Sequence, residues 1–141
     1  NALANGDICM AMGYSGDINI ARQRAIDSKS GQDIQALIPP TGATLFFDTM
    51  AIPKDAKHPK NAHLFINYIL RPEVHASLTN KVFYANPNLA SKKFVTKSVA
   101  DNPTVFPSAA DIAKLTVPDA VPQDIRRVQT RVFTSFKANT K

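Results

Sequence analysis

The opening part of the chain follows a strand, helix, strand pattern, which restricts it to folds that combine helices with a sheet. Residues 8–12 form an apolar run, residues 13–16 interrupt it, and a helical spacing of apolar residues begins beside Asp17. A Ser-Gly pair ends that helix, and residues 33–38 alternate as a second short strand. Because carboxylates are common N-caps, Asp17 has an ordinary structural explanation. The pattern predicts a β-α-β unit and the α/β fold class.

The strongest strand pattern covers residues 43–52, where alternate side chains share a face. Phe46 and Asp48 fall on one face, and Phe47 falls on the other. Taken alone, the two phenylalanines are typical core residues. An acidic residue in the middle of a strand costs stability unless it is paired or faces a solvent-filled cleft. Asp48 therefore needs an explanation beyond packing.

Prolines divide the rest of the chain into short helices, because most of the ten prolines lie after position 52. We expect helices at residues 59–70, 72–78, 89–94, 97–100, 108–115 and 122–137, and a brief extended piece at residues 82–84. Ser108 and Asp111 resemble a capping arrangement for one of them. The last helix is amphipathic, with an apolar stripe made by Ile125, Val128, Val132, Phe133 and Phe136.

Several classes of protein are excluded or disfavoured by what the chain contains. A single cysteine, Cys9, cannot form an intrachain disulfide or a cysteine-based zinc cluster, and its apolar neighbours predict a small core residue. No apolar run approaches the roughly 20 residues that span a bilayer. His58, His63 and His75 do not have metal-ligand spacing, and we expect them on helix surfaces. Phosphate loops, metalloprotease helices and nucleophile elbows are absent from the sequence, so we expect no enzyme, no metal and no cofactor.

What remains is a set of aromatic residues beside carboxylates. Tyr14 precedes Asp17, Phe46 precedes Asp48, and Tyr84 follows another aromatic residue. An ammonium group that leaves water must recover its solvation from a carboxylate and from aromatic faces. Two separated carboxylates could also read the spacing between two amines. The combination therefore favours a cationic organic ligand.

An ordered series of sequence blocks supports the same conclusion. The blocks are Leu3-Ala4-Asn5-Gly6-Asp7-Ile8, Tyr14-Ser15-Gly16-Asp17, Phe46-Phe47-Asp48, Asn67-Tyr68-Ile69-Leu70-Arg71-Pro72-Glu73-Val74 and Val82-Phe83-Tyr84-Ala85-Asn86. This series resembles the bacterial periplasmic polyamine-binding proteins, and in particular the putrescine-binding branch. The resemblance covers essentially the whole chain, and the order of the blocks is more specific than any one of them.

The resemblance implies a fold, a division of the chain and a location. Proteins of this kind are the periplasmic capture subunits of ABC transporters, with a type II periplasmic binding protein fold of two α/β lobes that enclose the polyamine. The chain would correspond to the C-terminal portion, which agrees with a start at Asn1 that lacks a signal segment. Residues 1–41 would then belong to the second lobe, residues 42–83 would return to the first lobe, and residues 84–141 would complete the second lobe with the amphipathic helix.

The resemblance also implies which residues bind the ligand. Carried over residue by residue, the aromatic residues of the cleft fall on Tyr14, Phe46 and Tyr84, and the amine-binding aspartates fall on Asp17 and Asp48. Tyr14 departs from the family pattern, in which this position is usually Trp, and a phenol offers a smaller stacking surface than an indole. Because the groups that the family contributes from its first half are not in this sequence, we expect only part of the site here.

The partners expected from the resemblance are putrescine or a related polyamine, an ABC transporter permease, and the missing N-terminal portion or a second copy, with no nucleic acid. A basic nucleic-acid-binding module is the alternative, because the net charge is +6 and Arg126, Arg127 and Arg131 lie on the last helix. Steeply salt-dependent retention on DNA would favour that alternative. A binding protein for iron or another small solute would need several converging tyrosines or histidines, and the chain has only Tyr14, Tyr68 and Tyr84 as tyrosines.

Overall fold

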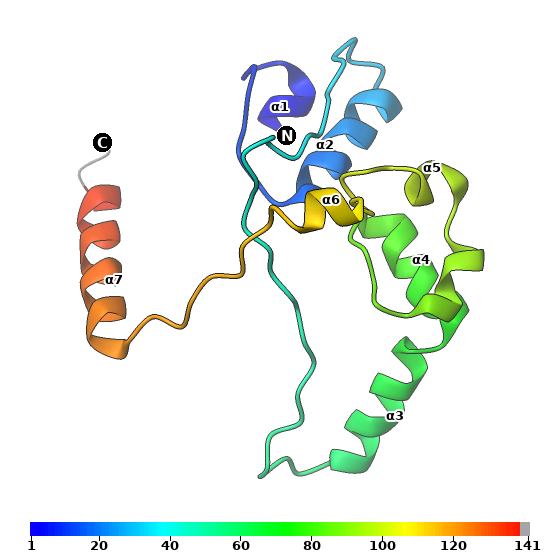
Figure 1. Cartoon of the computed structure of the whole chain (residues 1–141), viewed down its shortest axis with the longest axis vertical. Coiled ribbons are helices and arrows are strands. Elements are labelled where there is room, and N and C mark those ends of the chain that lie inside the picture. The colour runs from blue at the N-terminus through cyan, green and yellow to red at the C-terminus, as the bar shows by residue number, and fades with distance from the viewer. Residues whose placement is uncertain (139–141) are drawn as a thin grey trace.

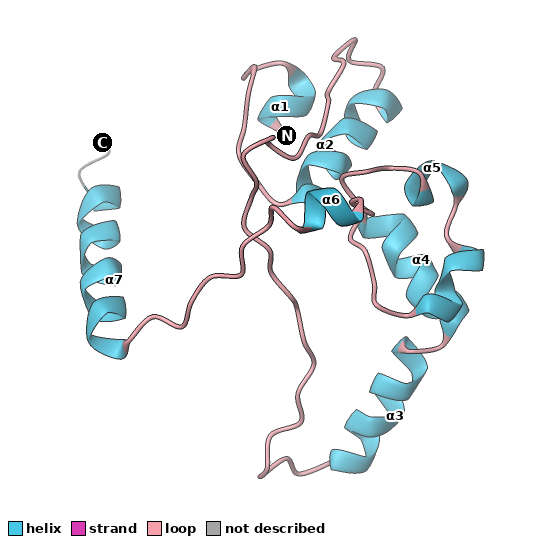
Figure 2. Cartoon of the chain, viewed as in Figure 1, coloured by secondary structure: helices cyan, strands magenta, loops and turns pink. Residues whose placement is uncertain are grey.

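The computed structural model of the chain describes residues 1–138. It is built from short helices joined by long connections, as Figures 1 and 2 show. The helices are α1 (Ala2–Asn5), α2 (Ser15–Asp27), α3 (Pro59–Ile69), α4 (Pro72–Val82), the 3-10 helix η1 (Leu89–Phe94), α5 (Lys97–Ala100), α6 (Ala109–Ile112) and α7 (Gln123–Ala138). These bounds confirm the helices expected between the prolines, although residues 89–94 form a 3-10 helix and α6 is shorter than expected.

The local sequence explains where these helices begin. Pro59 and Pro72 are the first residues of α3 and α4, where the fixed φ of proline suits a helix and its missing N–H is not needed. The helix expected beside Asp17 begins earlier, at Ser15, and its N-cap is Tyr14, which makes no side-chain cap hydrogen bond. The expectation that Asp17 is an N-cap is therefore wrong, because this carboxylate lies inside the first turn of α2.

The expected strands do not form in the part of the chain that the structure describes. Residues 8–12 and 33–38 are loops, and residues 43–52 contain only one bridge residue, Thr44. The extended piece expected at residues 82–84 is wrong as well, because Val82 ends α4 and Phe83 has a left-handed backbone with φ 57°. A strand is stabilised by hydrogen bonds to a neighbouring strand, and these segments lie beside none among residues 1–138. The structure therefore does not confirm the α/β class.

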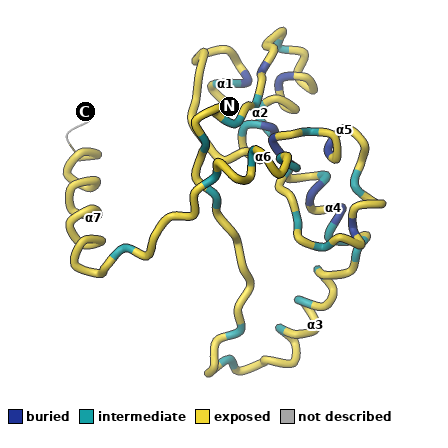
Figure 3. Tube along the Cα trace, in the orientation of Figure 1, coloured by how far each residue is buried: buried dark blue, intermediate teal, exposed yellow. Residues whose placement is uncertain are grey.

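The packed body of the molecule is formed by α1, α2, α4, η1 and α5. Figure 3 shows the buried positions gathered there, while α3 and α7 are almost wholly exposed. Ala4, Ala25 and Ile34 form a small apolar core with α1 packed on α2. Cys9 is exposed, so its expected role as a core residue is wrong. Without a sheet to cover residues 8–12, their side chains are exposed.

Two long segments leave this body at a single crossing. Thr44 and Thr116 form a parallel bridge, in which the Leu45 N–H donates to the Thr116 carbonyl at 2.9 Å and the Thr116 N–H donates to the Ala43 carbonyl at 3.0 Å. Beyond this crossing, residues 46–58 lead to α3 and residues 117–122 lead to α7, which stands apart from the other helices in Figure 1. Phe46 and Asp48 therefore follow directly after a position where the backbone is held by hydrogen bonds.

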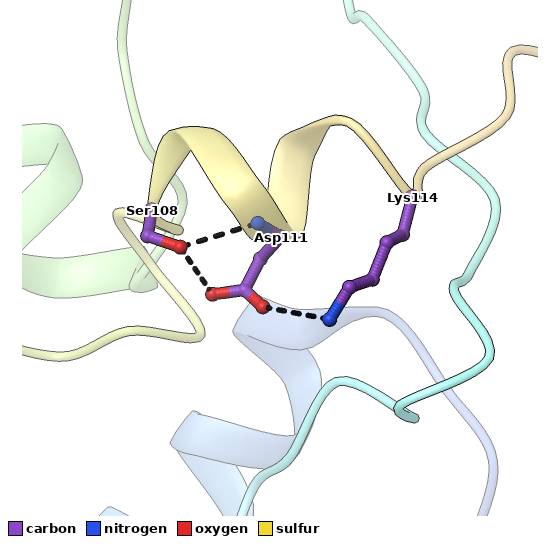
Figure 4. Close-up of polar contacts among 3 residues, drawn as sticks. All are labelled: Ser108, Asp111 and Lys114. Carbon is purple, nitrogen blue, oxygen red and sulfur yellow. Dashed lines mark hydrogen bonds and ion pairs between the residues drawn. The ribbon is translucent and has the colours of Figure 1, made fainter.

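A short capped helix, α6, leads the chain into this crossing. Ser108 accepts a hydrogen bond from the Asp111 N–H at 3.1 Å and donates to the Asp111 carboxylate at 2.6 Å, which confirms the expected capping arrangement. Lys114 approaches the other carboxylate oxygen at 3.7 Å (Figure 4). The Ser108 hydroxyl lowers the pKa of Asp111, and Lys114 acts in the same direction.

The last helix, α7, is amphipathic as expected, but its apolar stripe is exposed. Val132, Phe133 and Phe136 are 61%, 57% and 65% exposed, respectively. The Lys137 ammonium lies 4.9 Å from the centroid of the Phe133 ring. Within residues 1–138, no helix combines the length and the apolar character that a membrane crossing requires.

Candidate functional site

The expected ligand-binding residues come from three separate segments of the chain. We call Tyr14, Asp17, Phe46, Asp48 and Tyr84 the aromatic-acidic cluster. Tyr14 and Asp17 flank the start of α2, Phe46 and Asp48 follow the Thr44 crossing, and Tyr84 follows α4.

Tyr84 lies directly against the first turn of α2. A Cβ atom placed on Gly16 would fall 2.2 Å from Cε2, 2.5 Å from Cζ and 2.6 Å from Cδ2 of Tyr84. The tyrosine ring therefore occupies the space that a side chain at position 16 would fill. This contact brings the phenol of Tyr84 beside Asp17, the next residue of α2.

The negative charges of both cluster carboxylates act on the phenol of Tyr84. Partial burial and the negative charge of Asp17 raise the pKa of Tyr84, a hydrogen bond to the Asp17 backbone acts in the opposite direction, and Asp48 and Tyr14 raise it further. The phenol thus lies within electrostatic reach of Asp17, Asp48 and Tyr14 together. A cation placed among these groups would offset the negative charge of the two aspartates.

A ring contact joins the remaining member of the cluster. The rings of Tyr14 and Phe46 meet edge to face, with centroids 5.7 Å apart and planes inclined by 78°. This geometry is a favourable one for aromatic pairs. The structure therefore brings together all the residues that the sequence assigned to the site, through Tyr84 on one side and Phe46 on the other.

Both aspartates of the cluster remain available to a ligand. Asp17 and Asp48 are exposed, and the ion pairs among residues 1–138 are Lys97 with Asp101 and Lys114 with Asp111. Neither cluster carboxylate is therefore neutralised by a neighbouring lysine or arginine in the described part of the chain. Asp17 also lies in the first turn of α2, where the free N–H groups of the helix stabilise a negative charge.

A network of hydrogen bonds around the buried Asn19 amide holds the start of α2 in place. The Asn19 side-chain Nδ2 donates to the Ser15 carbonyl and to the Thr104 hydroxyl, each at 2.8 Å. The Asn102 amide donates to Asn19 Oδ1 at 2.9 Å. Asn19 is 3% exposed, so its amide depends on these partners for hydrogen bonding. The network holds the turn that carries Asp17.

A second amide network fixes the loop that carries Tyr84. The Asn86 side chain donates to the Thr79 hydroxyl at 2.8 Å and accepts from the Ser91 hydroxyl at 2.8 Å and from the Asn88 N–H at 3.0 Å. Thr79 and Ser91 are 2% and 1% exposed. Tyr84 is therefore presented by a loop that is hydrogen-bonded to both α4 and η1.

Sequence reasoning missed the residues that hold the cluster in place. Gly16, Asn19 and Asn86 carry no charge and no ring, so they did not stand out as site residues. The one available signal was the glycine directly before Asp17, since glycine is unfavourable within a helix. The glycine is explained by its contact with the Tyr84 ring. Because Tyr84 is distant in sequence, the pattern of residues could not predict that contact.

Other locations suit a cationic organic ligand less well. A cavity of about 340 Å³ is lined by Arg22, Asp33, Gln35, Ala36, Ser98, Asp101, Asn102 and Pro103. It mixes positive and negative groups and offers no ring on which a cation could stack. The third tyrosine, Tyr68, lies on α3 with the Arg71 guanidinium 5.5 Å from its ring centroid, so it already has a cation beside it.

Comparison with known proteins gives one family and several relatives. The family model described as "Bacterial extracellular solute-binding protein" matches residues 1–107. The "Putrescine-binding periplasmic protein PotF" of Escherichia coli is 44% identical over 98% of this chain and 37% of its own length. The "Putrescine-binding periplasmic protein SpuD" of Pseudomonas aeruginosa is 41% identical over 96% of this chain and 37% of its own length.

A third relative is less similar in sequence. The "Spermidine/putrescine-binding periplasmic protein" of Salmonella typhimurium is 31% identical over 81% of this chain and 31% of its own length. The chain thus spans about a third of the length of the curated relatives that it matches, 37% of PotF and of SpuD and 31% of the Salmonella protein.

Proposed function

The chain belongs to the bacterial extracellular solute-binding protein family, and on this basis we propose that it forms part of a capture protein for polyamine uptake. The family implies a two-lobed periplasmic binding fold, and its relatives are solute-binding proteins rather than enzymes. The proposed ligand is putrescine or a related diamine, held between two lobes by carboxylate–ammonium pairs and aromatic stacking. Capture in the periplasm and delivery to an ABC transporter permease are parts of the same proposal.

The observation that carries this proposal is the convergence of the aromatic-acidic cluster. Three segments of the chain bring Asp17 and Asp48 within electrostatic reach of the Tyr84 phenol, and neither carboxylate has a cationic partner among the described residues. Tyr14 and Phe46 add an aromatic pair beside them. The cluster therefore holds negative charge that no described lysine or arginine neutralises, beside two largely exposed rings.

Diamine chemistry matches this arrangement. Each cation–π contact contributes about 0.5–2 kcal/mol, and a charge-assisted hydrogen bond contributes at least as much. Two carboxylates on different segments suit two ammonium groups joined by an aliphatic chain, which gains by stacking on the rings. A single monovalent cation would leave one of the two negative charges uncompensated.

We propose further that the chain carries only one side of the binding site. Tyr14 is 57% exposed and Phe46 is 55% exposed, so the cluster is open rather than enclosed. Enclosure is what removes water from ion pairs and strengthens them. Residues 1–41 and 84–141 would belong to the second lobe and residues 42–83 to the first, with the remaining groups supplied by the N-terminal portion of the same protein or by a second copy.

Mass spectrometry of small amines that co-purify with the full-length protein tests the proposal. We expect one equivalent of a diamine from the wild-type protein and a marked loss from a variant with both Asp17→Asn and Asp48→Asn. A variant with both Asp55→Asn and Asp119→Asn, two acidic residues outside the cluster, removes the same number of negative charges and controls for total charge. Recovery of the same amine from all three proteins would contradict the assignment of the site.

A further inference from the structure

Gly16 stands in a place where the backbone gives no reason for a glycine. It is a buried residue in the first turn of α2, and it is not among the glycines with a positive φ. Any L-residue could adopt its backbone conformation, and glycine is one of the least favourable residues inside a helix. The reason for glycine at this position must therefore lie in what surrounds it.

The surroundings supply that reason in the ring of Tyr84. The space for a Cβ atom at position 16 is taken by Cε2, Cζ and Cδ2 of Tyr84, at 2.2, 2.5 and 2.6 Å. These distances are far below van der Waals contact. Because the atoms belong to the end of a side chain, a larger residue at position 16 would displace the ring and leave the helix intact.

We propose that Gly16 is a positioning residue that seats Tyr84 beside Asp17 in the ligand site. The inference rests on the function proposed above for the aromatic-acidic cluster, and it adds a residue that has neither a charge nor a ring. With the ring seated, the phenol lies within reach of Asp17 and Asp48. If the ring is displaced, both carboxylates remain in place, but the Tyr84 ring no longer lies beside them.

Gly13 provides a matched control. A Cβ atom placed on Gly13 would meet only the Ile18 side chain, at 3.4 and 3.8 Å, which is ordinary contact. Gly13→Ala therefore adds the same methyl group a few residues away without touching Tyr84. Because alanine is the better helix former, Gly16→Ala should keep the helical circular dichroism of the wild type.

The first experiment measures the solvent accessibility of the Tyr84 ring without any ligand. The chain contains no tryptophan and its tyrosines are Tyr14, Tyr68 and Tyr84, so the variant Tyr14→Phe/Tyr68→Phe fluoresces from Tyr84 alone. We expect Gly16→Ala to increase acrylamide quenching of that fluorescence, and Gly13→Ala to leave it unchanged. Equal quenching in the two variants would overturn the proposal.

The second experiment measures putrescine affinity in the full-length protein by calorimetry. Gly16→Ala should lower the affinity about tenfold, the effect of losing one well-placed aromatic contact to a cation. In a Tyr84→Ala background, Gly16→Ala should cause no further loss, because there is no ring to displace. An equal loss in both backgrounds would overturn the positioning role. If the wild type binds no putrescine, the function proposed above fails, while the quenching comparison still decides whether Gly16 seats Tyr84.

Discussion

The side-chain amide of Asn19 donates a hydrogen bond to the Thr104 hydroxyl at 2.8 Å, and so ties the first turn of α2 to the segment after α5. The same amide donates to the Ser15 carbonyl, one residue from the Tyr14 ring. The position of two cluster residues, Tyr14 and Asp17, therefore depends on a buried amide outside the cluster.

We expect Asn19→Ala to lower the free energy of unfolding by about 1–3 kcal/mol, because it leaves buried hydrogen-bonding groups without partners. Urea denaturation of the wild type and the variant measures the difference. Gln23→Ala, which removes an exposed hydrogen bond to Asp27 on the same helix, is the control and should change stability by less than about 0.5 kcal/mol. Equal effects of the two substitutions would mean that the Asn19 network is not a structural anchor.

Removing either cluster carboxylate should weaken diamine binding. We expect Asp17→Asn and Asp48→Asn each to cost about 1.5–3 kcal/mol of putrescine affinity in the full-length protein, the range for a hydrogen bond to a charged group. Both side chains are exposed, so the substitutions should leave the stability of the fold nearly unchanged. Calorimetric titration checks the affinities, with Asp55→Asn as the charge-matched control. Wild-type affinity in both cluster variants would remove these carboxylates from the site.

The crossing of the two long segments should be sensitive to a methyl group at Gly42. This glycine has φ 98°, and a Cβ atom on it would lie 2.1 Å from the backbone carbonyl oxygen of Lys114. Gly31 has a comparable φ of 78°, but a Cβ atom there would meet nothing within 4 Å. We expect Gly31→Ala to cost about 1–2 kcal/mol from backbone strain alone, and Gly42→Ala to cost more. Thermal unfolding of both variants measures the difference, and equal destabilisation would show that the Lys114 contact is not tight.

The raised pKa of Tyr84 predicts a stability loss at alkaline pH. A phenol is neutral when protonated, so a raised pKa means that the folded state holds this proton more tightly than the unfolded state. The stabilisation is fully present below about pH 10, the ordinary tyrosine pKa, and it is lost as the pH rises through the higher value of the folded state. Tyr84→Phe should therefore show a shallower loss of stability above that pH, measured by urea denaturation at a series of pH values. The same pH dependence of stability in the wild type and in Tyr84→Phe would contradict the raised pKa of Tyr84.

The helices could be predicted from sequence because their signals are local. Pro59 and Pro72 begin α3 and α4 where the sequence placed them, and Ser108 caps α6 as expected. The strands could not be verified in the same way, because a strand forms only beside a partner. Residues 43–52 have the right alternation but only the Thr44 bridge in this structure.

Asp48 could be singled out from the sequence for a chemical reason, whereas the residues that hold the cluster in place could not. Asp48 stood out because an acidic residue in an apolar run needs a partner, and its aromatic neighbour suggested a cation. Gly16 and Asn86 act through contacts with residues distant in the chain, and such contacts leave no periodic signal. Cys9 failed as a core residue for the same reason, since its burial depended on a sheet that the described residues do not form.

Calorimetric titration with putrescine, performed on the full-length protein and on the isolated 141-residue chain, tests the account most directly. The account predicts saturable one-to-one binding by the full-length protein and weak or undetectable binding by the isolated chain, whose cluster is open to solvent. Absence of binding by the full-length protein would contradict the proposed ligand. Tight one-to-one binding by the isolated chain would contradict the proposal that it carries only one side of the site.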